Sequence, residues 1–476
     1  AVLALLGALA SLPVAAVTLR FVASLALTSN LAVSLSVPAL VFGGAAALAT
    51  LLVFGLAPAI QASHTDLASI IKGQAAQSRG GRGVARFNRA LIATQIAFAT
   101  ILLVLAGLFT RSLINVSRLD LGMAVESVAS FSVSPLLSGY TSDALDAIYD
   151  RVQTALAAQP GVHSVGSGAI PILGNFALGA NVTSVDGVDL PPNTNADANY
   201  EVSPRFFESF SVPLLAGRDF NAADRTSPAV AIVNEAFVKK LGLGKDAVGK
   251  HVRVRAFYAP SPDLEIIGVV GDMRLASVKR DVAAQIFLPR PRGDTSFSSL
   301  FFFVRGELGA DSLLSMIPRV VASVDPNLPV GNLSTVKRLA KNNVSQDRIV
   351  TILSTVLAAL ATGLAAIGLY GVLAYSVAQR TRELGLRLAL GAEPSELRAM
   401  VLKQVAVLAV VGAGLGLAAA LAVSRVAGAM LYGLSSYDPT SVGAAVAILA
   451  AVVLGAAYVP ARHASSVAPI EALRYE

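Results

Sequence analysis

The sequence contains no cysteine, and only 14% of its residues are charged. Without thiols the chain can form neither disulfides nor thiolate metal sites, although this does not fix its compartment. Soluble domains carry about a quarter of their residues as charged side chains. The shortage of charge, together with a hydrophobic content of 54%, therefore excludes a protein that lies wholly in water.

Catalytic motifs are also scarce. The four histidines lie far apart and outside any H-E-x-x-H pattern, which argues against a zinc site. No serine stands in a G-x-S-x-G nucleophile elbow. Asp219, Asp224 and Asp272 lie in turn-rich stretches, so we interpret them as turn and cap residues and not as an acid–base pair.

The stretch GKDAVGKH, residues 244–251, differs from a phosphate-binding loop by one residue. The pattern G-x-x-x-x-G-K-[ST] needs a hydroxyl for Mg²⁺, but His251 stands in its place. Such a loop also follows a strand and precedes a helix. Here the preceding NEAFVKKLG predicts a helix that Asn234 caps, and the following KHVRVRAF alternates like a strand.

The reversed flanks and the missing hydroxyl favour an ordinary turn over a nucleotide site. We interpret Gly242, Gly244 and Gly249 as turn glycines and Lys250 as a solvated charge. We therefore expect that this chain does not hydrolyse ATP.

Long charge-free apolar runs dominate the rest of the sequence. A helix needs about 20 apolar residues to cross the roughly 30 Å of hydrocarbon in a bilayer. Runs of this kind occupy residues 90–110, 349–377, 404–424 and 439–461. Two more occupy residues 1–27 and 37–58, separated by the polar turn Thr28-Ser29-Asn30. The sequence thus predicts a membrane protein with six spans, and a chain that begins partway through a span.

Lysine and arginine gather in the loops on one side of these spans. Loop 59–89, loop 380–403 and the tail after residue 461 are basic, whereas the turns on the other side carry almost no charge. By the positive-inside rule the basic side is cytoplasmic. The net charge of +7 then reflects topology, and no nucleic acid is expected as a partner. Residues 112–345 form one extracytoplasmic domain.

This domain is expected to be α+β with two subdomains. Ser142 and Asp143 can cap a helix that runs to Ala158, and a second helix follows Asp311 and ends before Asp325. The apolar runs VAIVN, EIIGVV and FFFV predict buried strands.

The fourth apolar run is too long for a bilayer. Residues 349–379 carry no charge, which corresponds to about 46 Å of helix at 1.5 Å per residue. Helical pattern continues upstream to Ser334 as a cap. We expect one rod from the outer domain through the membrane into the cytoplasmic segment QRTRELGLRLALGAEPSELR, where Gly391 ends the helix and Ser395 caps the next one.

This cytoplasmic segment mixes leucines with arginines, as interfacial helices do. Two interpretations stay open, a helix held on anionic lipid and a docking helix for a cytoplasmic partner. A second cytoplasmic feature is an internal repeat at the ends of two spans. PAIQAS ends the second and PARHAS the sixth, the shared residues being Pro58, Ala59, Ala62, Ser63 and Pro460, Ala461, Ala464, Ser465. The repeat suggests a duplicated unit.

Several stretches together resemble the FtsX/MacB-like permeases of ABC transporters. QRTRELGLRLALGA and the closing PARHASSVAPIEALR are similar to the permease domain, and VSPRFFESFSVPLLAGRDF, AVAIVNEAFVKKL, GKDAVGKHV and EIIGVVGDMR are similar to the MacB-type periplasmic core domain. The resemblance covers essentially the whole chain. It is most like the duplicated permeases of the acidobacterial type, with the N-terminal part of the first copy missing.

The resemblance implies a domain organisation. Residues 1–58 would be the last two helices of a first permease unit, 59–89 a cytoplasmic loop and 90–111 a transmembrane helix. Residues 112–345 would be the periplasmic core domain, and 346–476 the FtsX-like permease domain with three spans.

The resemblance also implies partners and a mechanism. A separate cytoplasmic MacB- or LolD-like ATPase would bind ATP, so the chain itself needs no cofactor. Its ATPase-coupling residues would be Arg380, Arg382, Glu383, Gly385, Arg387, Gly391 and Ala392. ATP-driven closure would move the outer domain, a mode called mechanotransmission, for efflux or extraction of a substrate. The full-length chain would form an internal pseudo-dimer in membrane lipid. A periplasmic adaptor or a substrate protein is a further candidate partner.

Two other functions compete with this one. The alternative is an FtsX-like regulator whose outer domain activates a periplasmic cell-wall hydrolase. It would bind protein through residues 112–345 and export nothing. A membrane-anchored enzyme would require activity from the isolated outer domain.

Overall fold

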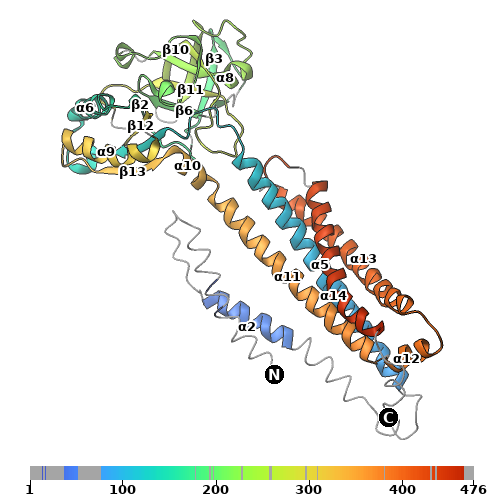
Figure 1. The fold of residues 1–476 in the computed structure, drawn as a ribbon. Helices are drawn as coiled ribbons and strands as arrows, with labels where there is room; N and C mark the ends of the chain where they lie inside the picture. Colours follow the sequence, from blue (N-terminus) through green and yellow to red (C-terminus); the bar gives the residue numbers. More distant parts are fainter. Residues whose placement is uncertain are drawn as a thin grey trace. The chain divides into compact units, whose positions relative to one another are not determined.

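The apolar runs form long helices in the computed structural model, which describes residues 13, 17, 37–51, 77–176, 178–191, 195–196, 198–226, 229–256, 260–294, 297, 299–307, 309–379, 381–428, 431–434 and 437–465. The chain divides into two compact units (Figure 1). One consists of Ala1–Ser117 with Gln346–Glu476, and the other is Arg118–Ser345.

The first unit is helical. Its helices are α2 (Val37–Leu51), α5 (Gln77–Ser117), α11 (Ser345–Gln379), α12 (Thr381–Ala389), α13 (Pro394–Ala427) and α14 (Pro439–Ser465). Four of them, α5, α11, α13 and α14, are long and apolar enough to cross a membrane, which confirms the four spans predicted within them. The two N-terminal spans predicted at 1–27 and 37–58 lie largely outside the described residues.

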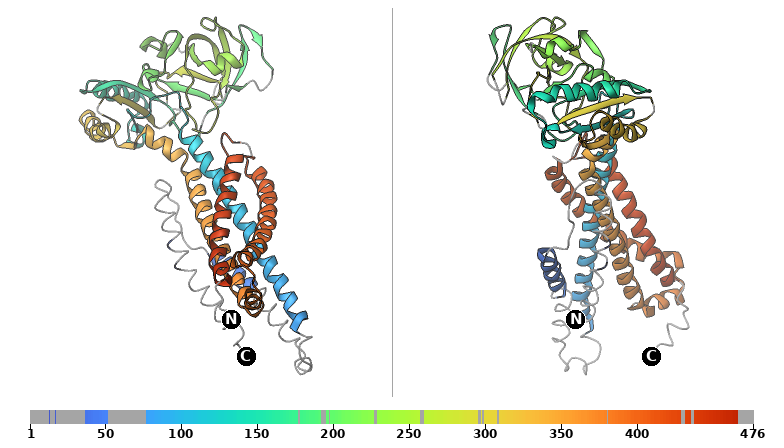
Figure 2. Two further views of the ribbon diagram at one scale, coloured as in Figure 1. Left: turned by 45° about the vertical axis from the view of Figure 1, so that its right-hand side comes forward. Right: turned by 90° about the vertical axis from the view of Figure 1, so that its left-hand side faces the viewer.

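The four long helices lie side by side (Figure 1, Figure 2) and share a buried core. Ile96 of α5, Leu369 of α11, Val405 of α13 and Leu449 of α14 belong to one hydrophobic cluster. The outward faces are also apolar, because residues such as Leu364 of α11 are exposed. Helices that are apolar on both faces suit a lipid environment.

Helix α13 approaches α5 closely at two glycines. A Cβ at Gly412 would lie 2.8 Å from the carbonyl oxygen of Ala93, and one at Gly416 would lie 2.5 Å from that of Ala97. Carbon atoms do not tolerate such distances, so this approach requires residues without a side chain. Small residues let membrane helices pack backbone to backbone, which compensates for the lack of a hydrophobic driving force in lipid.

Polar contacts join the end of α5 to the start of α14. Arg111 of α5 pairs with Asp438, the residue before α14. Asp438 also accepts hydrogen bonds from the backbone N–H of Ser441 (2.8 Å) and from its hydroxyl (2.6 Å). The Ser112 hydroxyl accepts a bond from the Tyr432 N–H at 2.9 Å. One carboxylate therefore caps α14 and ties it to α5.

The second unit is an α+β domain on one mixed sheet, with strand order β13-β1-β12-β2-β6-β11-β8-β10-β9-β3-β4, β5 beside β3 and β7 beside β10. The strands are β1 (Val128–Val133), β2 (Val162–Gly168), β3 (Ala180–Val185), β4 (Val188–Asp189), β5 (Asn195–Ala196), β6 (Ala198–Val202), β7 (Leu214–Gly217), β8 (Val230–Asn234), β9 (His251–Ala256), β10 (Pro260–Val270), β11 (Gln285–Pro289), β12 (Leu300–Gly306) and β13 (Val330–Thr335). The helices are η2 (Pro135–Ser138), η3 (Ser142–Ala144), α6 (Leu145–Ala157), α7 (Phe206–Ser209), η4 (Ala222–Arg225), α8 (Glu235–Lys240), α9 (Ala310–Val324) and α10 (Val336–Asn343).

Two hydrophobic cores divide this domain, as the sequence predicted. In the first, Phe131 of β1 and Ile317 of α9 are fully buried together with side chains of α6 and β12. In the second, Phe237 of α8 and Ile266 of β10 are buried with side chains of β3, β9 and β11. Strands β2 and β6 join the two subdomains by a single antiparallel pair, Gly168 with Val202, so the sheet is continuous but its connection is narrow.

The predicted strands VAIVN, EIIGVV and FFFV are confirmed in β8, β10 and β12, and the two predicted helices correspond to η3 with α6 and to α9. Three predicted caps are wrong, those of α6, α13 and α10. Ala144, not Ser142 or Asp143, precedes α6, without a side-chain cap. Helix α13 begins one residue before Ser395, because Pro394 at its first position fits the helical φ without needing an N–H partner.

The predicted continuous rod is interrupted. Thr335, not Ser334, caps α10, since its Oγ1 accepts the Arg338 N–H at 3.1 Å. Helix α10 ends at Asn343, and Val344 follows with φ −104° and ψ 13° before α11 begins. Helix α11 itself is unbroken for 35 residues.

The side chain of Asn343 holds the end of α10 within the outer domain. Its Oδ1 accepts the Val278 N–H at 3.0 Å, and its Nδ2 donates to the carbonyl of Leu173 at 2.8 Å. A second donation reaches Asn175 Oδ1 at 3.0 Å. The break after Asn343 therefore follows a residue whose amide is fully engaged with the domain.

We predict that Gly416→Leu destabilises the helical unit by about 2–4 kcal/mol, because a side chain at this position collides with the α5 backbone. Thermal denaturation of the purified chain in detergent measures the loss. Gly414→Leu is the matched control, since a Cβ at Gly414 meets no described atom within 4 Å. Equal melting temperatures for the two variants would contradict the close packing of α13 on α5.

Candidate functional sites

The stretch that resembles a phosphate-binding loop forms a turn between a helix and a strand. Helix α8 precedes it, with Asn234 as N-cap accepting the Phe237 N–H at 3.0 Å, and β9 follows it. Gly242, Gly244 and Gly249 have φ angles of 63°, 68° and 88°. These left-handed conformations confirm them as turn glycines. The order of helix, turn and strand is the reverse of a phosphate-binding loop.

Lys250 does not behave as predicted. Its side chain is still 32% exposed, but the charge is not free in solvent, because its Nζ pairs with Asp186 Oδ2 at 2.9 Å. The other oxygen of Asp186 accepts the His251 N–H at 2.9 Å. Both bonds lower the pKa of the Asp186 carboxyl, and the bond from the His251 backbone is the larger cause. Lys250 and His251 thus fix the turn after β3, in place of binding phosphate and Mg²⁺.

The three aspartates interpreted as turn and cap residues have those roles. Asp224 completes a capping box with Asn221 at η4, and Asp272 Oδ1 accepts the Ala236 N–H at 2.9 Å in the first turn of α8. Asp219 Oδ1 accepts the Phe220 N–H at 2.7 Å. Asp219 also lines a cleft described below.

The segment predicted to couple to an ATPase forms α12 and the turn after it. The Ala392 N–H donates to Arg387 O at 3.0 Å and the Gly391 N–H to Leu388 O at 3.1 Å, while Gly391 has φ +94°. This is a Schellman motif, which requires a left-handed residue after the helix. Gly391 therefore ends α12.

Leu397 positions α12 on the helices beside it. It is 1% exposed and packs against Val377 of α11, Leu388 of α12 and Val401 of α13. Arg387 Nη1 lies 3.6 Å from the Met400 sulfur. The segment is thus fixed on the α11–α13 hairpin and does not hang from it as a free loop.

Three of the other predicted coupling residues belong to α12. Gly385 is buried within α12, Arg382 and Glu383 lie in the same helix, and Arg380 lies outside the described residues. Leu386 and Leu390 are exposed by 52% and 80%. Exposed leucines beside arginines suit either lipid or a protein partner, so both interpretations of this segment stay open.

Only the second copy of the repeated helix-exit motif belongs to the described residues. Pro58, Ala59, Ala62 and Ser63 lie outside the described residues. PARHAS forms the last six residues of α14, which includes Pro460 and runs to Ser465. Pro460 and Ala461 are buried, and Ala464 and Ser465 belong to the last turn.

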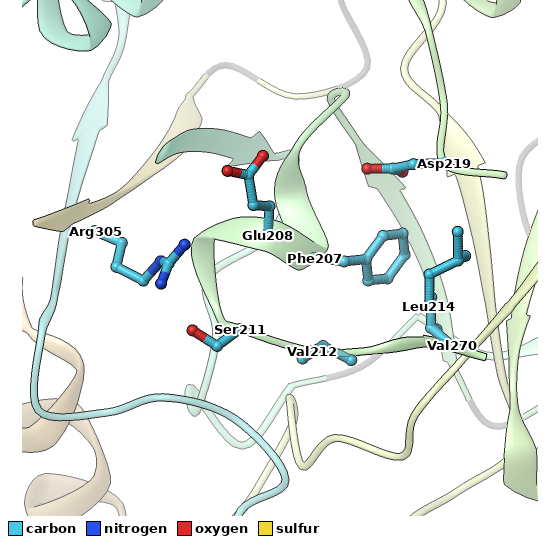
Figure 3. A pocket seen from close by; sticks show the side chains of 8 residues that line it. All are labelled: Phe207, Glu208, Ser211, Val212, Leu214, Asp219, Val270 and Arg305. Carbon is cyan, nitrogen blue, oxygen red and sulfur yellow. The ribbon is translucent and has the colours of Figure 1, made fainter. Parts of the chain in front are cut away.

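The outer domain has a cleft of about 360 Å³. Figure 3 shows its lining, with Arg305 at one end, Asp219 and Leu214 at the other, and Phe207 between them. Glu208, Ser211, Val212 and Val270 complete the lining. Arg305 belongs to β12 in the first subdomain and Leu214 to β7 in the second, so the cleft lies at the seam of the two. No motif in the sequence marks this site, although VSPRFFESFSVPLLAGRDF supplies six of its eight residues.

An aromatic cluster holds the cleft in shape. Phe206 packs edge-on against Phe207, Phe210 and Phe303, with ring centroids 5.2–5.7 Å apart. Helix α7, which carries Phe207, follows Arg205 (φ 66°). Left-handed backbone is costly for residues with a side chain, so the surrounding packing must compensate for it.

The same seam contains a partly buried charge network. Asp146 in α6 accepts hydrogen bonds from Arg225 (2.8 Å), Arg290 (3.2 Å) and the Gly293 N–H (2.7 Å). The Arg290 guanidinium also lies 4.9 Å from the centre of the Tyr149 ring. Because Asp146 and Tyr149 belong to the first subdomain and Arg225 and Arg290 to the second, these contacts hold the two subdomains together.

Glu201 lies at this seam, in β6. Burial raises the pKa of its carboxyl to about 7, the nearby Asp294 carboxylate adds to the rise, and Arg290 opposes it. Its Oε2 is buried without a hydrogen-bond partner among the described residues. A protonated Glu201 avoids a charge that this environment does not compensate.

The chain matches two family models. Residues 34–327 match the MacB-like periplasmic core domain, and residues 355–469 match the FtsX-like permease C-terminal. The stretches that suggested the resemblance in the sequence lie within these two ranges, except for the last residues of the tail.

The chain is also similar to individual proteins. A probable export ATP-binding/permease protein MacB of Pseudomonas entomophila is 24% identical over 298 residues, which cover 59% of this chain and 43% of that protein. A macrolide export ATP-binding/permease protein MacB of Hahella chejuensis is 25% identical over 353 residues, 70% of this chain and 49% of that protein. The chain thus spans about half the length of these relatives.

Among solved structures, the periplasmic region of MacB from Actinobacillus actinomycetemcomitans aligns with 47% of this chain and 95% of its own length. The sequence identity is 13% and the TM-score is 0.30.

We predict that stability falls as the pH rises from about 4.5 to 7. In this window the unfolded chain has lost the Glu201 proton and the folded chain still binds it, so each step in pH favours unfolding. Glu201→Gln removes this penalty. It should raise the melting temperature of the outer-domain transition at pH 8 and leave it nearly unchanged at pH 5, as measured by circular dichroism of the full chain.

Glu126→Gln is the control, because Glu126 forms an exposed ion pair with Lys337 on the same domain. It should keep the pH dependence of the unchanged protein. A Glu201→Gln variant that melts with the original pH dependence would show that Glu201 titrates normally.

Proposed function

The chain belongs to the MacB-like family of ABC transporter permeases, multi-pass proteins of the inner membrane with a periplasmic domain, and we propose that it is the membrane subunit of an exporter driven by a separate ATPase. In this proposal a cytoplasmic subunit of the MacB or LolD type binds and hydrolyses ATP. The permease passes the resulting motion to its periplasmic domain, which moves the substrate.

The observation that carries this proposal is the continuity of α11. It runs for 35 residues from the last residue of the outer domain to the start of α12. At 1.5 Å per residue this is about 52 Å, well beyond the roughly 30 Å of hydrocarbon. A helix without an internal break transmits displacement along its axis.

The cytoplasmic end of α11 supports the same interpretation. Leu397 holds α12 against both α11 and α13, so a force on α12 reaches two transmembrane helices. The exposed leucines and the arginines of α12 suit an interface with a protein partner. We propose that α12 and its turn, from Arg380 to Ala392, are where the ATPase binds.

At its outer end the proposed relay is not one continuous helix, because α10 and α11 are separate. Asn343 ties α10 to the outer domain through four hydrogen bonds, to Leu173, Asn175, Ser277 and Val278. Val344 alone separates this point from α11. Motion of α11 along its axis therefore reaches the outer domain at Asn343, through these four hydrogen bonds.

The nucleotide site belongs to the partner in this proposal. The relatives are named as combined ATP-binding/permease proteins, and the one stretch of this chain that resembles a phosphate-binding loop folds as a turn closed by Lys250 and Asp186. We accordingly propose that the chain binds no ATP, that lipid surrounds its apolar outer faces, and that a second permease unit completes a pseudo-dimer.

We predict that Arg387→Glu lowers co-purification with a co-expressed MacB-type ATPase at least tenfold, since it reverses a charge at the centre of the proposed interface. Affinity purification from membranes followed by quantitative immunoblotting measures the ratio of the two proteins. The purified chain alone should show no ATPase activity, and the complex should.

Arg398→Glu is the matched control, because Arg398 is an exposed arginine on the same side of the membrane, in the first turns of α13. It should leave the complex intact. The proposal fails if Arg387→Glu forms as much complex as the unchanged chain, or if the isolated chain hydrolyses ATP. Binding of a cell-wall hydrolase by the outer domain, without export, would support the regulator instead.

A further inference from the structure

The cleft at the seam of the outer domain has no part in the relay from α12 to Asn343. Most of its lining comes from one stretch, residues 207–219, which folds back on itself through α7 and β7. Its volume of about 360 Å³ is at the lower end of the range for small-molecule sites. The cleft is mostly apolar between its ends, where Phe207 and Val212 lie, and Val270 lies beside Leu214.

One end of the cleft has a positive charge that is poorly compensated. The Nε of Arg305 is buried and has no hydrogen-bond partner among the described residues. The carboxylate of Glu208 interacts electrostatically with Arg305, but its hydrogen bonds of 2.8 and 3.0 Å go to Arg205. A buried guanidinium N–H without an acceptor is costly, so Arg305 gains from an anion beside the part of its guanidinium that lines the cleft, where arginine binds carboxylates in a planar geometry.

The other end has a carboxylate without a basic partner. Asp219 accepts backbone hydrogen bonds from Phe220 and from Arg205, and no described lysine or arginine forms an ion pair with its side chain. Burial raises the pKa of its carboxyl, and the carboxylates of Glu208 and Asp224 also raise it. An ammonium group placed beside Asp219 would favour its ionised form and bind to it.

The cleft is held in shape by its surroundings. Phe206 fixes α7 against Phe210 and Phe303, and left-handed residues flank the helix at Arg205 and Ser211. Strain of this kind persists only where packing enforces it and is common at binding sites. A site that exists before the ligand arrives loses little conformational entropy on binding.

We propose that this cleft binds a small dipolar molecule with a carboxylate, an apolar body and an ammonium group, of which a short apolar peptide is the simplest example. The carboxylate contacts Arg305, the ammonium contacts Asp219, and the apolar body lies on Phe207 and its neighbours. The site goes beyond the proposed export function, because binding requires neither ATP nor the partner subunit. Since Arg305 and Leu214 belong to different subdomains, the ligand bridges the seam.

Leucyl-leucine is the probe, titrated into the full chain in lipid nanodiscs and followed by isothermal calorimetry. We expect saturable binding with one site per chain. Leucyl-leucinamide lacks the carboxylate and N-acetyl-leucyl-leucine lacks the ammonium, so each should bind at least tenfold more weakly, a difference of about 1.4 kcal/mol. These comparisons use the unchanged protein and do not depend on how any variant folds.

Two substitutions assign the ends of the ligand. Arg305→Met should weaken leucyl-leucine at least tenfold and remove its advantage over leucyl-leucinamide, and Asp219→Asn should remove its advantage over the acetylated peptide. Arg319→Met and Asp311→Asn change exposed residues of α9 and should leave binding unchanged.

Three results would overturn the proposal. They are no saturable binding of leucyl-leucine at 10 mM or below (on the order of the weakest specific affinities), equal binding of all three peptides, and full binding by Arg305→Met. None of these bears on complex formation with the ATPase, so the site and the export function stand or fall separately.

Discussion

The structure of the membrane unit depends on one constraint, that backbone polar groups inside hydrocarbon must be hydrogen-bonded within the chain. Helices α5, α11, α13 and α14 satisfy this by running unbroken across the apolar region. The polar contacts between helices, Arg111 with Asp438 and Ser112 with Tyr432, lie at their ends. Inside the bundle, glycines let the helix backbones pack closely against each other, and this packing takes the place of polar contacts between the helices. Gly412 and Gly416 bring α13 against the α5 backbone, and Gly368 of α11 leaves room for the Gln95 side chain.

The outer domain is organised by a different constraint. Its sheet is continuous, but β2 and β6 share a single residue pair, so side chains must hold the two cores together. The acid–base network around Asp146 and the aromatic cluster around Phe206 do this. Both place titratable groups, Glu201 and Asp219, in partly buried positions where ionisation is costly. The features that respond to pH and to ligands therefore gather at the seam, because the seam is where polar groups replace hydrophobic packing.

Local signals in the sequence predicted much of this fold. The four spans followed from apolar runs longer than any soluble helix requires, and β8, β10 and β12 followed from short apolar runs between turns. The turn at residues 244–251 followed from its flanks, since NEAFVKKLG and KHVRVRAF have different periods. These predictions held because each depends on residues within about one element of chain.

The errors concern contacts between distant residues. Lys250 was expected to be solvated because Asp186, its partner, is 64 positions away. The break at Val344 was missed because "STVKRLAKNNVSQDR" reads as one helix, and the Asn343 side chain bonds to residues 65 to 170 positions earlier. The cleft was missed because Arg305 comes from a strand about a hundred residues after α7. One local signal was available, since Arg205 and Glu208 stand among three phenylalanines in PRFFESF, and the structure exposes the two charged residues and buries the phenylalanines.

The break at Val344 changes how a relay through this chain has to be understood. A single rod from the cytoplasm into the outer domain would turn the domain as a lever, and any bend of the bundle would be multiplied at its tip. An interrupted rod transmits displacement along its axis and permits rotation at the joint. Asn343 sits on the domain side of that joint, bonded to the segments after β2 and after β10. Those two segments also hydrogen-bond to each other, through the N–H groups of Leu173 and Asn175 and the carbonyls of Leu275 and Ala276. In the proposed relay, a pull on α11 would therefore reach the outer domain first at these two paired segments, because Asn343 binds both of them.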